Sequence, residues 1–438
     1  TDNGMGHLGR RARKKKKKMT TESLTLCHES RFVELRRWLK ERGFKSKLLI
    51  PAHFSDTGRG LMATSPIKVN DMLISLPERC LLTTSTVLRS YLGEYIKRWK
   101  PPVSPVLALC AFLIAERHAG SLSKWKPYID VLPQAYNCPA YFSDEVINLL
   151  PSGLRAKAQD QKERVWELHS SAATFFASLQ PLLQEPVVTV FSHDALRWAW
   201  CSVNTRTVYM RHPQSPHLST ELDVYALAPY LDLLNHCPKV QVTAEFSQAN
   251  RCYEIRSVQG CRKFNQAFIC YGPHDNQRLL LEYGFVAPSN PHAVVYVDLG
   301  TLKLCFNDWD KQLPQKLLFL KEHDFLMNLT FGLDGPSWRL MTALRLLSLK
   351  PEQYACWKTV LLGAAVSKDR EEWTTQTALM LCKILLGESS MALERLSHLK
   401  QGAGSSMTEQ LSVVEFLRRE EQAILGAYRQ AKALSLRQ

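Results

Sequence analysis

The chain has 438 residues, of which 45% are hydrophobic and 22% are charged, and its net charge is +15. This balance excludes an intrinsically disordered protein, and the length predicts two or three domains with sizeable apolar cores. The longest strongly apolar run, residues 106–115, is too short to span a bilayer, so we expect no membrane association. The 12 cysteines contain no CxxC pair and no zinc-ligand spacing, which predicts reduced thiols and no metal site.

The first residues of the chain carry much of its positive charge. Residues 1–18 hold eight basic residues and one acid, which supply +7 of the net charge and leave +8 for the other 420 residues. The basic run at residues 10–18 is typical of a nuclear-import signal or a nucleic-acid contact, and also of a solvated tail that attracts polyanions. No apolar stretch follows it, as a secretory signal requires. We expect residues 1–28 to form a disordered basic tail, and the protein to occupy the nucleus and the cytoplasm.

The next segment indicates a helix followed by strands. Apolar residues recur at helical spacing over residues 30–42, at Phe32, Leu35, Trp38 and Leu39. A β-rich piece follows, with a break at the glycines of residues 58–61. Residues 72–77 are a short apolar run that ends at a proline, which predicts a buried strand.

Helical patterns then surround a mixed segment. The pattern is helical from about residue 84 to 196, and residues 106–115 are apolar all round, as expected of a buried helix. Residues 197–287 are mixed, with strands predicted at residues 252–258 and 267–271.

The remainder of the chain, from about residue 314, is again helical. Two helices are indicated by the apolar spacing of Leu340, Ala343, Leu344 and Leu347, and of Val413, Leu417, Ile424, Tyr428 and Ala431. We therefore expect one domain over residues 29–290, with a helical insertion at about 84–196, and a helical domain over residues 300–438.

Chemistry-bearing residues recur in a fixed order along the chain. Asn235 and His236 are followed 35 residues later by Tyr271, and Tyr283 follows after 12 more residues. Gly58, Arg59 and Gly60 precede them near the start of the β-rich piece, and Arg206 precedes Asn235. Each residue also has a structural interpretation: a turn for the glycines, a surface arginine, a satisfied core histidine, or a core tyrosine that closes a strand. The shared order and spacing, rather than any one residue, favour a functional interpretation.

This order resembles the SET-domain methyltransferases of the Rubisco large-subunit methyltransferase type. The likeness covers about residues 45–430 and includes a Trp-x-Pro-Tyr…Leu-Pro signature in the helical insertion, at Trp125, Pro127, Tyr128, Leu132 and Pro133. It implies an α+β fold: a SET domain of short β-sheets with a pseudoknot, split by a helical insertion. An all-α C-terminal substrate-binding domain would follow.

The resemblance also implies a cofactor and site residues. The cofactor is S-adenosylmethionine, whose methyl group moves to a lysine amine that must be unprotonated and aligned. The implied catalytic residues are Tyr271 and Tyr283, and no residue binds a metal. The implied cofactor-binding residues are Gly58, Arg59, Gly60, Arg206, Asp232, Asn235, His236, Tyr271 and Phe285. Arg206 is expected to pair with the carboxylate of the cofactor, as a bidentate guanidinium can.

The resemblance predicts a protein-lysine N-methyltransferase that acts on histone or nonhistone proteins. Two alternatives stay open: methylation of another acceptor such as histidine, and a non-catalytic adaptor that binds a partner through the helical domain. A nucleic-acid binder that depends on the basic tail is a third interpretation, and the tail can also contact nucleosomes. The sequence does not identify the substrate.

Overall fold

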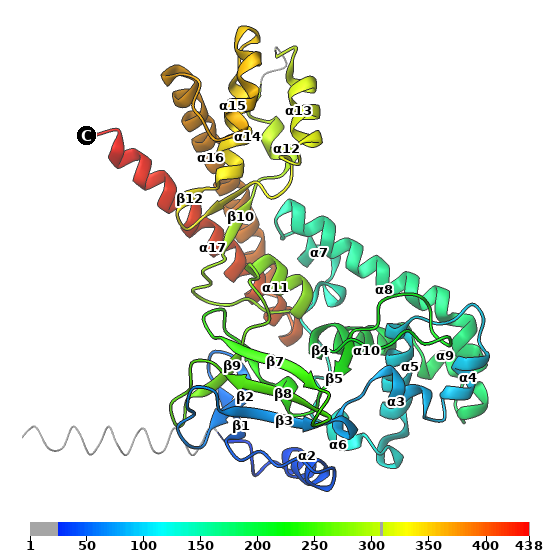
Figure 1. Ribbon diagram of the computed structural model, residues 1–438. Helices are drawn as coiled ribbons and strands as arrows, with labels where there is room; N and C mark the ends of the chain where they lie inside the picture. Colours follow the sequence, from blue (N-terminus) through cyan, green and yellow to red (C-terminus); the bar gives the residue numbers. More distant parts are fainter. Residues whose placement is uncertain (1–24, 307–309, 438) are drawn as a thin grey trace, which may run out of the picture. The chain divides into compact units, whose positions relative to one another are not determined.

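The computed structural model describes residues 25–306 and 310–437, and they form two compact units (Figure 1). The first unit comprises residues 25–136 and Arg164–Pro273, and the second comprises Asn137–Glu163 and the residues from His274 onward. The basic run at residues 10–18 lies outside the described residues, so its disorder stays a prediction. Residues 25–28, assigned to the tail from the sequence, include Thr25, which pairs with Ala52 in an isolated β-bridge.

A four-stranded sheet in the first unit has the strand order β1-β2-β9-β6. Strands β1 (Leu49–Phe54) and β2 (Gly58–Ala63) form an antiparallel hairpin, and β9 (Gln266–Ile269) pairs antiparallel with β2. The two-residue strand β6 (Asn235–His236) runs parallel to β9. A parallel neighbour requires a crossover rather than a tight turn, so this pair joins segments that are distant in sequence.

The break predicted at residues 58–61 is wrong, because these residues begin strand β2. Gly58 has φ +75°, a left-handed value that glycine adopts without strain, and it starts the strand after the hairpin turn. Gly60 lies inside the sheet, where an added Cβ would be 2.5 Å from Oε1 of Gln266 and 2.9 Å from Nδ2 of Asn235. The glycine therefore makes room for two neighbouring side chains within a continuous strand.

Two smaller sheets complete the β-structure of the first unit. Strands β3 (Met72–Pro77), β8 (Cys252–Ser257) and β7 (Val242–Ser247) form one, in the order β3-β8-β7. Strands β4 (Thr207–Tyr209) and β5 (Tyr225–Leu227) form the other. The predicted strand at residues 72–77 is confirmed, and β8 confirms the one predicted at residues 252–258.

The helices of the first unit pack around one continuous core that also includes its strands. They are α2 (Ser30–Glu41), α3 (Thr84–Leu88), α4 (Gly93–Arg98), α5 (Pro105–Ala119), α6 (Lys126–Ile129), α9 (Val187–Val190) and α10 (His193–Arg206). Helix α2 buries the four apolar residues that its spacing predicts. Helix α8 (Ser152–Ser178) crosses the division between the units.

Helix α5 is the apolar helix that the sequence predicts to be buried. Its N-cap, Ser104, accepts a hydrogen bond from the backbone N–H of Leu107 at 3.1 Å, and Pro105 occupies the first turn, where no N–H is needed. By length and composition alone, residues 105–122 are sufficient to cross a membrane, but 61% of this window is buried inside the protein. A core helix of this apolarity meets the same criterion.

The second unit is mainly helical. Its helices are α7 (Asp144–Ile147), α11 (Asn276–Tyr283), α12 (Leu299–Lys303), α13 (Leu313–Glu322), α14 (Trp338–Ser348), α15 (Trp357–Leu361), α16 (Lys368–Lys400) and α17 (Ser405–Ser435). The predicted helical C-terminal region is confirmed. One small sheet of β10 (Val294–Tyr296), β11 (Thr330–Gly332) and β12 (Gly335–Pro336) was not predicted, because such short strands leave no periodic signal.

Candidate active site

The parallel pair of β6 and β9 brings the Asn-His segment to Tyr271. Asn235 aligns with Phe268 and His236 aligns with Ile269. Beyond the strand, the backbone N–H of Tyr271 donates to Nδ1 of His236 at 3.0 Å, and the two ring centroids are 5.1 Å apart. Tyr271 therefore lies two residues past the end of β9, not within the strand predicted at residues 267–271, and His236 fixes its backbone.

The hydroxyl of Tyr271 is also fixed in direction. It donates to the backbone carbonyl oxygen of Leu234 at 2.7 Å, one residue before Asn235. Because its hydrogen is used in this bond, the phenolic oxygen presents lone pairs to any group that approaches it. The half-buried Tyr271 is thus held at its backbone by His236 and at its ring tip by Leu234.

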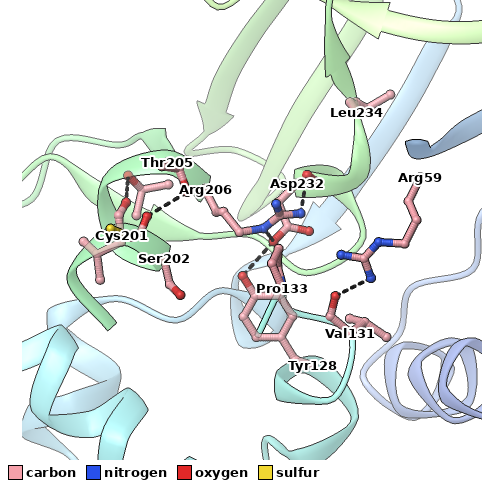
Figure 2. A network of polar contacts seen from close by, with 12 residues as sticks. Arg59, Tyr128, Val131, Pro133, Cys201, Ser202, Thr205, Arg206, Asp232 and Leu234 are labelled. Carbon is pink, nitrogen blue, oxygen red and sulfur yellow. Dashed lines mark hydrogen bonds and ion pairs between the residues drawn. The ribbon is translucent and has the colours of Figure 1, made fainter. Parts of the chain in front are cut away.

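Arg206 and Asp232 form a buried ion pair at the C-terminal end of α10 (Figure 2). Nε of Arg206 donates to Oδ2 of Asp232 at 3.1 Å, and Nη2 donates to its backbone carbonyl oxygen at 2.9 Å. The hydroxyl of Tyr128 donates to the same Oδ2 at 2.8 Å. The side chains of Arg206 and Asp232 are only 17% and 2% exposed, so the alternative interpretation of Arg206 as a surface arginine is wrong.

The charges of this pair support each other. Burial by itself lowers the pKa of Arg206, but Asp232 and neighbouring tyrosines, Tyr271 among them, raise it above its ordinary value. Burial and the Asp232 carboxylate raise the pKa of Tyr128 well above its ordinary value, so its hydroxyl stays protonated and remains a donor. Arg206 is therefore a permanent cation whose orientation is set by Asp232 and Tyr128.

Arg59 adds a second cation to the same region. It belongs to β2, and its Nη1 donates to the backbone carbonyl oxygen of Val131 at 2.7 Å (Figure 2). Burial lowers the pKa of Arg59, and the neighbouring positive charge of Arg206 lowers it further. The carboxylate of Asp232 pairs with Arg206 and acts on Arg59 only through its charge, which leaves a surplus of positive charge in a partly buried place. This surplus suits a ligand that brings a carboxylate.

Asn235 ties strand β2, which carries Arg59, to the Asn-His segment. Its Nδ2 donates to the backbone carbonyl oxygen of Arg59 and to Oε1 of Gln266, both at 2.8 Å. The absence of a Cβ at Gly60 makes this approach possible. The side chain of Asn235 therefore links β6 to β2, the two strands that flank β9 in the sheet.

Tyr283 and Phe285 belong to the second unit. Tyr283 is the last residue of α11, and its ring centroid is 6.2 Å from that of Phe285 and 5.9 Å from that of His274. Burial raises the pKa of the Tyr283 hydroxyl. The aromatic pair that the sequence predicts is thus present as a local feature of this unit.

The structure brings most of the predicted site residues together. A single region of the first unit contains Arg59, Gly60, Arg206, Asp232, Asn235, His236 and Tyr271, whereas Gly58 lies at the hairpin end of β2 with no contact to them beyond its peptide bond to Arg59. Sequence reasoning missed the roles of Tyr128 and Gln266, which hold Asp232 and Asn235 in place. The Trp-x-Pro-Tyr signature contains Tyr128 and was the signal that could have identified it. Over residues 25–306 and 310–437, no group of three or more His, Cys, Asp or Glu side chains is arranged to hold a metal ion.

The sequence matches two protein families. Residues 58–272 match the family described as SET domain, and residues 307–425 match the family described as Rubisco LSMT substrate-binding. SET domain-containing protein 4 of Mus musculus is 53% identical over 418 residues, which are 95% of this chain and 95% of that protein. Actin-histidine N-methyltransferase of Homo sapiens is 28% identical over 298 residues, which are 66% of this chain and 48% of that protein.

A solved structure shares the fold. The crystal structure of the SET domain of LSMT bound to lysine and AdoHcy aligns with a TM-score of 0.63 at 22% identity, and the alignment covers 93% of each chain. The predicted fold class, a SET domain with a helical C-terminal region, is confirmed by this likeness and by the family matches.

Proposed function

Because this chain belongs to the SET domain-containing protein 4 family, we propose that it is an S-adenosylmethionine-dependent protein-lysine N-methyltransferase. One observation carries the proposal. The predicted site residues of the first unit other than Gly58 are far apart in sequence, but they form one cluster in the structure. Within it, His236 fixes the backbone of Tyr271, and Tyr271 is close enough to Arg206 to affect its pKa. Clusters of mutually perturbed charged and phenolic groups are typical of functional sites.

The cationic part of the cluster fits the cofactor. S-adenosylmethionine, when bound, supplies a methyl group on a sulfonium that can leave to a nucleophile. Arg59 and Arg206 have one more positive charge than Asp232 neutralises, and they are the groups to hold the cofactor's carboxylate. Asp232 itself is a positioning residue, because its carboxylate is already occupied by Arg206 and Tyr128. This assignment refines the one made from sequence, which placed Asp232 among the cofactor-binding residues.

Tyr271 is the proposed catalytic centre. Since its hydrogen is committed to the carbonyl of Leu234, its oxygen can accept weak C–H···O contacts from a polarised methyl group, and a hydrogen bond from an amine. A lysine has a pKa of about 10.4 in water, so its amine must lose a proton before it can attack. A channel that excludes water disfavours the ammonium form and thereby helps the lysine to deprotonate. Tyr283 and Phe285 keep the channel-lining role that the sequence resemblance implies.

The substrate is proposed to be a protein. The match of residues 307–425 to a substrate-binding family supports this, and histone and nonhistone lysines are both candidates. We also propose that the basic run at residues 10–18 directs part of the protein to the nucleus, while the rest stays in the cytoplasm. Fusing residues 1–28 to a fluorescent protein tests this: nuclear accumulation is expected, and a uniform distribution would overturn it.

Histidine is the alternative acceptor. A relative with 28% identity over 298 residues is an actin-histidine N-methyltransferase, so this architecture supports methylation of an imidazole. An imidazole has a pKa of about 6.5 and needs no deprotonation at neutral pH. Hydrolysis of the methylated product and separation of methyl-lysine from methyl-histidine distinguishes the two acceptors.

The proposal is tested by methyl transfer from labelled S-adenosylmethionine to core histones and to a cell extract. Tyr271→Phe keeps the ring against His236 but removes the hydroxyl, and we expect its rate to fall about 100-fold with cofactor binding retained. Tyr209→Phe is the matched control, because the ring of Tyr209 is 66% exposed on β4. A wild-type chain that neither labels protein nor binds cofactor would overturn the proposal and favour an adaptor. An equal loss in both variants would remove Tyr271 from the catalytic centre.

A further inference from the structure

Asn276, the first residue of α11, is buried at 1% exposure and uses its whole hydrogen-bonding capacity. Its Nδ2 donates to the backbone carbonyl oxygen of Ala287 at 3.0 Å and to Oε2 of Glu420 at 2.7 Å. Its Oδ1 accepts from the backbone N–H of Ala287 at 2.8 Å and from Nδ2 of Asn290 at 3.2 Å. An amide with two donors and two acceptor sites filled is a rigid connector.

The hydrogen bonds of Asn276 hold together the two ends of the chain that carries Tyr283 and Phe285, which we call the aromatic segment. Asn290 extends the closure, because its Nδ2 also donates to the backbone carbonyl oxygen of His274 at 2.9 Å. The hydrogen bonds of Asn276 and Asn290 thereby link residues at the start of α11 to residues that follow the helix. The segment from Tyr283 to Ala287 lies in the chain between these linked residues. At the helix end, Gly284 adopts φ +77° and its N–H donates to the carbonyl oxygens of the last turn of α11. Phe285 and Tyr283 therefore have a backbone that is fixed on both sides.

Glu420 is the member of this network that comes from α17, and residues 307–425 are those that match the substrate-binding family. It is half-buried, and burial raises its pKa to about 7, with a further rise from Asp275 that the bond to Asn276 opposes. Two neighbouring carboxylates have partners of their own. Asp275 accepts from Tyr296 and from the backbone of Arg278, and Glu421 pairs with Arg418.

We propose that Glu420 is a positioning residue for the reaction: through Asn276 it holds the segment that carries Tyr283 and Phe285. This inference rests on the proposed function for the roles of the two aromatic residues, but the link itself is a set of contacts within the second unit. An ionised carboxylate is a stronger acceptor than a neutral one, so the tie to Nδ2 tightens when Glu420 loses its proton. This hydrogen bond then adds a polar link between α17 and the aromatic segment to the apolar packing of Leu280 and Val286 in the core cluster that α17 shares.

Two variants separate the contact from the bulk of the side chain. Glu420→Gln keeps an acceptor oxygen at the same place but cannot ionise, and Glu420→Met keeps the length and removes the acceptor. Glu415→Met is the matched control on the same helix, because Glu415 pairs with Lys400 and Arg419 and does not contact Asn276. The full chain is labelled with 4-fluorophenylalanine, and the 19F signal of Phe285 is assigned with Phe285→Leu.

We expect the Phe285 signal to shift or broaden in Glu420→Met and to stay in place in Glu420→Gln and Glu415→Met. In the wild type, it should move with pH around a midpoint near 7, and this movement should be absent in Glu420→Gln. A movement that persists in Glu420→Gln would come from a group other than Glu420 and would overturn the proposal. An unchanged Phe285 signal in a folded Glu420→Met would overturn it as well. If Glu420→Met does not fold, the pH comparison of wild type and Glu420→Gln decides.

The methyl-transfer assay supplies the second reading. Glu420→Met should lower kcat about threefold to tenfold above pH 7 with little change in cofactor affinity, and Glu420→Gln should match the wild type below pH 7 and fall below it above pH 7. Equal rates in Glu420→Met and Glu415→Met would remove the positioning role. A wild-type chain that transfers no methyl group, but has the expected 19F titration, would refute the proposed function and leave the tie in place.

Discussion

Each unit buries an arginine beside carboxylates, and the two clusters have opposite surpluses of charge. In the first unit, Arg206 pairs with the carboxylate of Asp232, and Arg59 adds a second positive charge nearby. In the second unit, Arg418 and Glu421 are each 4% exposed at the side chain and lie 3.4 Å apart. Glu388 and Glu420 add their negative charges to this second cluster.

The excess charge of the two clusters depends on pH in different ways. Asp232 and nearby tyrosines raise the pKa of Arg206, so the first cluster stays cationic at every physiological pH. Burial raises the pKa of Glu421 from 4.5 to about 7, so the second cluster loses its surplus by binding a proton. A fixed surplus suits a place where an anionic ligand completes the charge balance. A surplus that protonation removes makes stability depend on pH instead.

The largest effect is expected from Asp232→Ala, which breaks the first cluster. It leaves Arg206 buried without its carboxylate and next to Arg59, so the free energy of unfolding should fall by about 3–5 kcal/mol. Urea denaturation at neutral pH measures this. Asp194→Ala is the control, because Asp194 is 82% exposed and contacts Arg197 on the surface of α10. A loss below about 1 kcal/mol would mean that Arg206 does not need Asp232 to be tolerated in the interior.

The second prediction concerns the pH dependence of the second cluster. A buried acid with a raised pKa keeps its proton when folded at a pH where the unfolded chain has lost it, so folding is favoured at low pH. The contribution of Glu421 is therefore complete below about pH 4.5 and is lost as the pH rises through about 7. Between these values it should lower the unfolding free energy by about 2–3 kcal/mol.

Glu421→Gln should remove that part of the pH dependence. Chemical denaturation of the variant at pH 5, 6, 7 and 8 is compared with the wild type and with Glu415→Gln. Glu415 is a suitable control because Lys400 and Arg419 lower its pKa, so its titration lies outside this window. If the slopes of wild type and Glu421→Gln coincide, Glu421 does not change its protonation on unfolding between pH 5 and 8.

Sequence periodicity predicted the buried helices because one apolar face requires a fixed spacing. Helix α2 follows this rule, whereas helix α5 and strand β3 were predicted from continuous apolar runs, which indicate burial on all sides. The same reasoning misread β2, since glycine usually interrupts a strand. There the missing Cβ of Gly60 admits the side chains of Asn235 and Gln266, and no local pattern reports on partners so far away in the chain.

The candidate site was predictable as a set of residues but not as a set of contacts. Sequence placed Arg206 and Asp232 in the site separately, as two residues that face the cofactor. The structure pairs them with each other, because the end of α10 meets the segment just before Leu233. Tyr128 is 104 residues from Asp232, and its hydrogen bond depends on the packing of the helical insertion. Contacts of this range follow from the fold and not from spacing.

A smaller effect is expected from Tyr128→Phe, which removes one hydrogen bond from the first cluster but leaves its ion pair. The variant removes one hydrogen bond to Oδ2 of Asp232 while the bond from Arg206 remains, so the unfolding free energy should fall by about 1 kcal/mol. Cofactor affinity, measured by calorimetry, should fall by less than about tenfold, because Arg206 keeps most of its support. A loss as large as that of Asp232→Ala would show that Tyr128, rather than Asp232, fixes the arginine.

The smallest effect is expected from Glu388→Gln in the second cluster. Glu388 contributes a negative charge near Glu421, and partial burial raises its own pKa, but the residue is still exposed, so solvent screens its interactions. We expect a change in unfolding free energy of about 0.5 kcal/mol or less, with the pH slope between 5 and 8 nearly that of the wild type. Glu421 is more buried than Glu388. A comparison of Glu388→Gln with Glu421→Gln therefore tests whether burial or the number of charges makes the unfolding free energy depend on pH. If Glu388→Gln flattened the slope as much as Glu421→Gln, the cluster would titrate as one unit, and the contrast with the permanently cationic first cluster would rest on charge number alone.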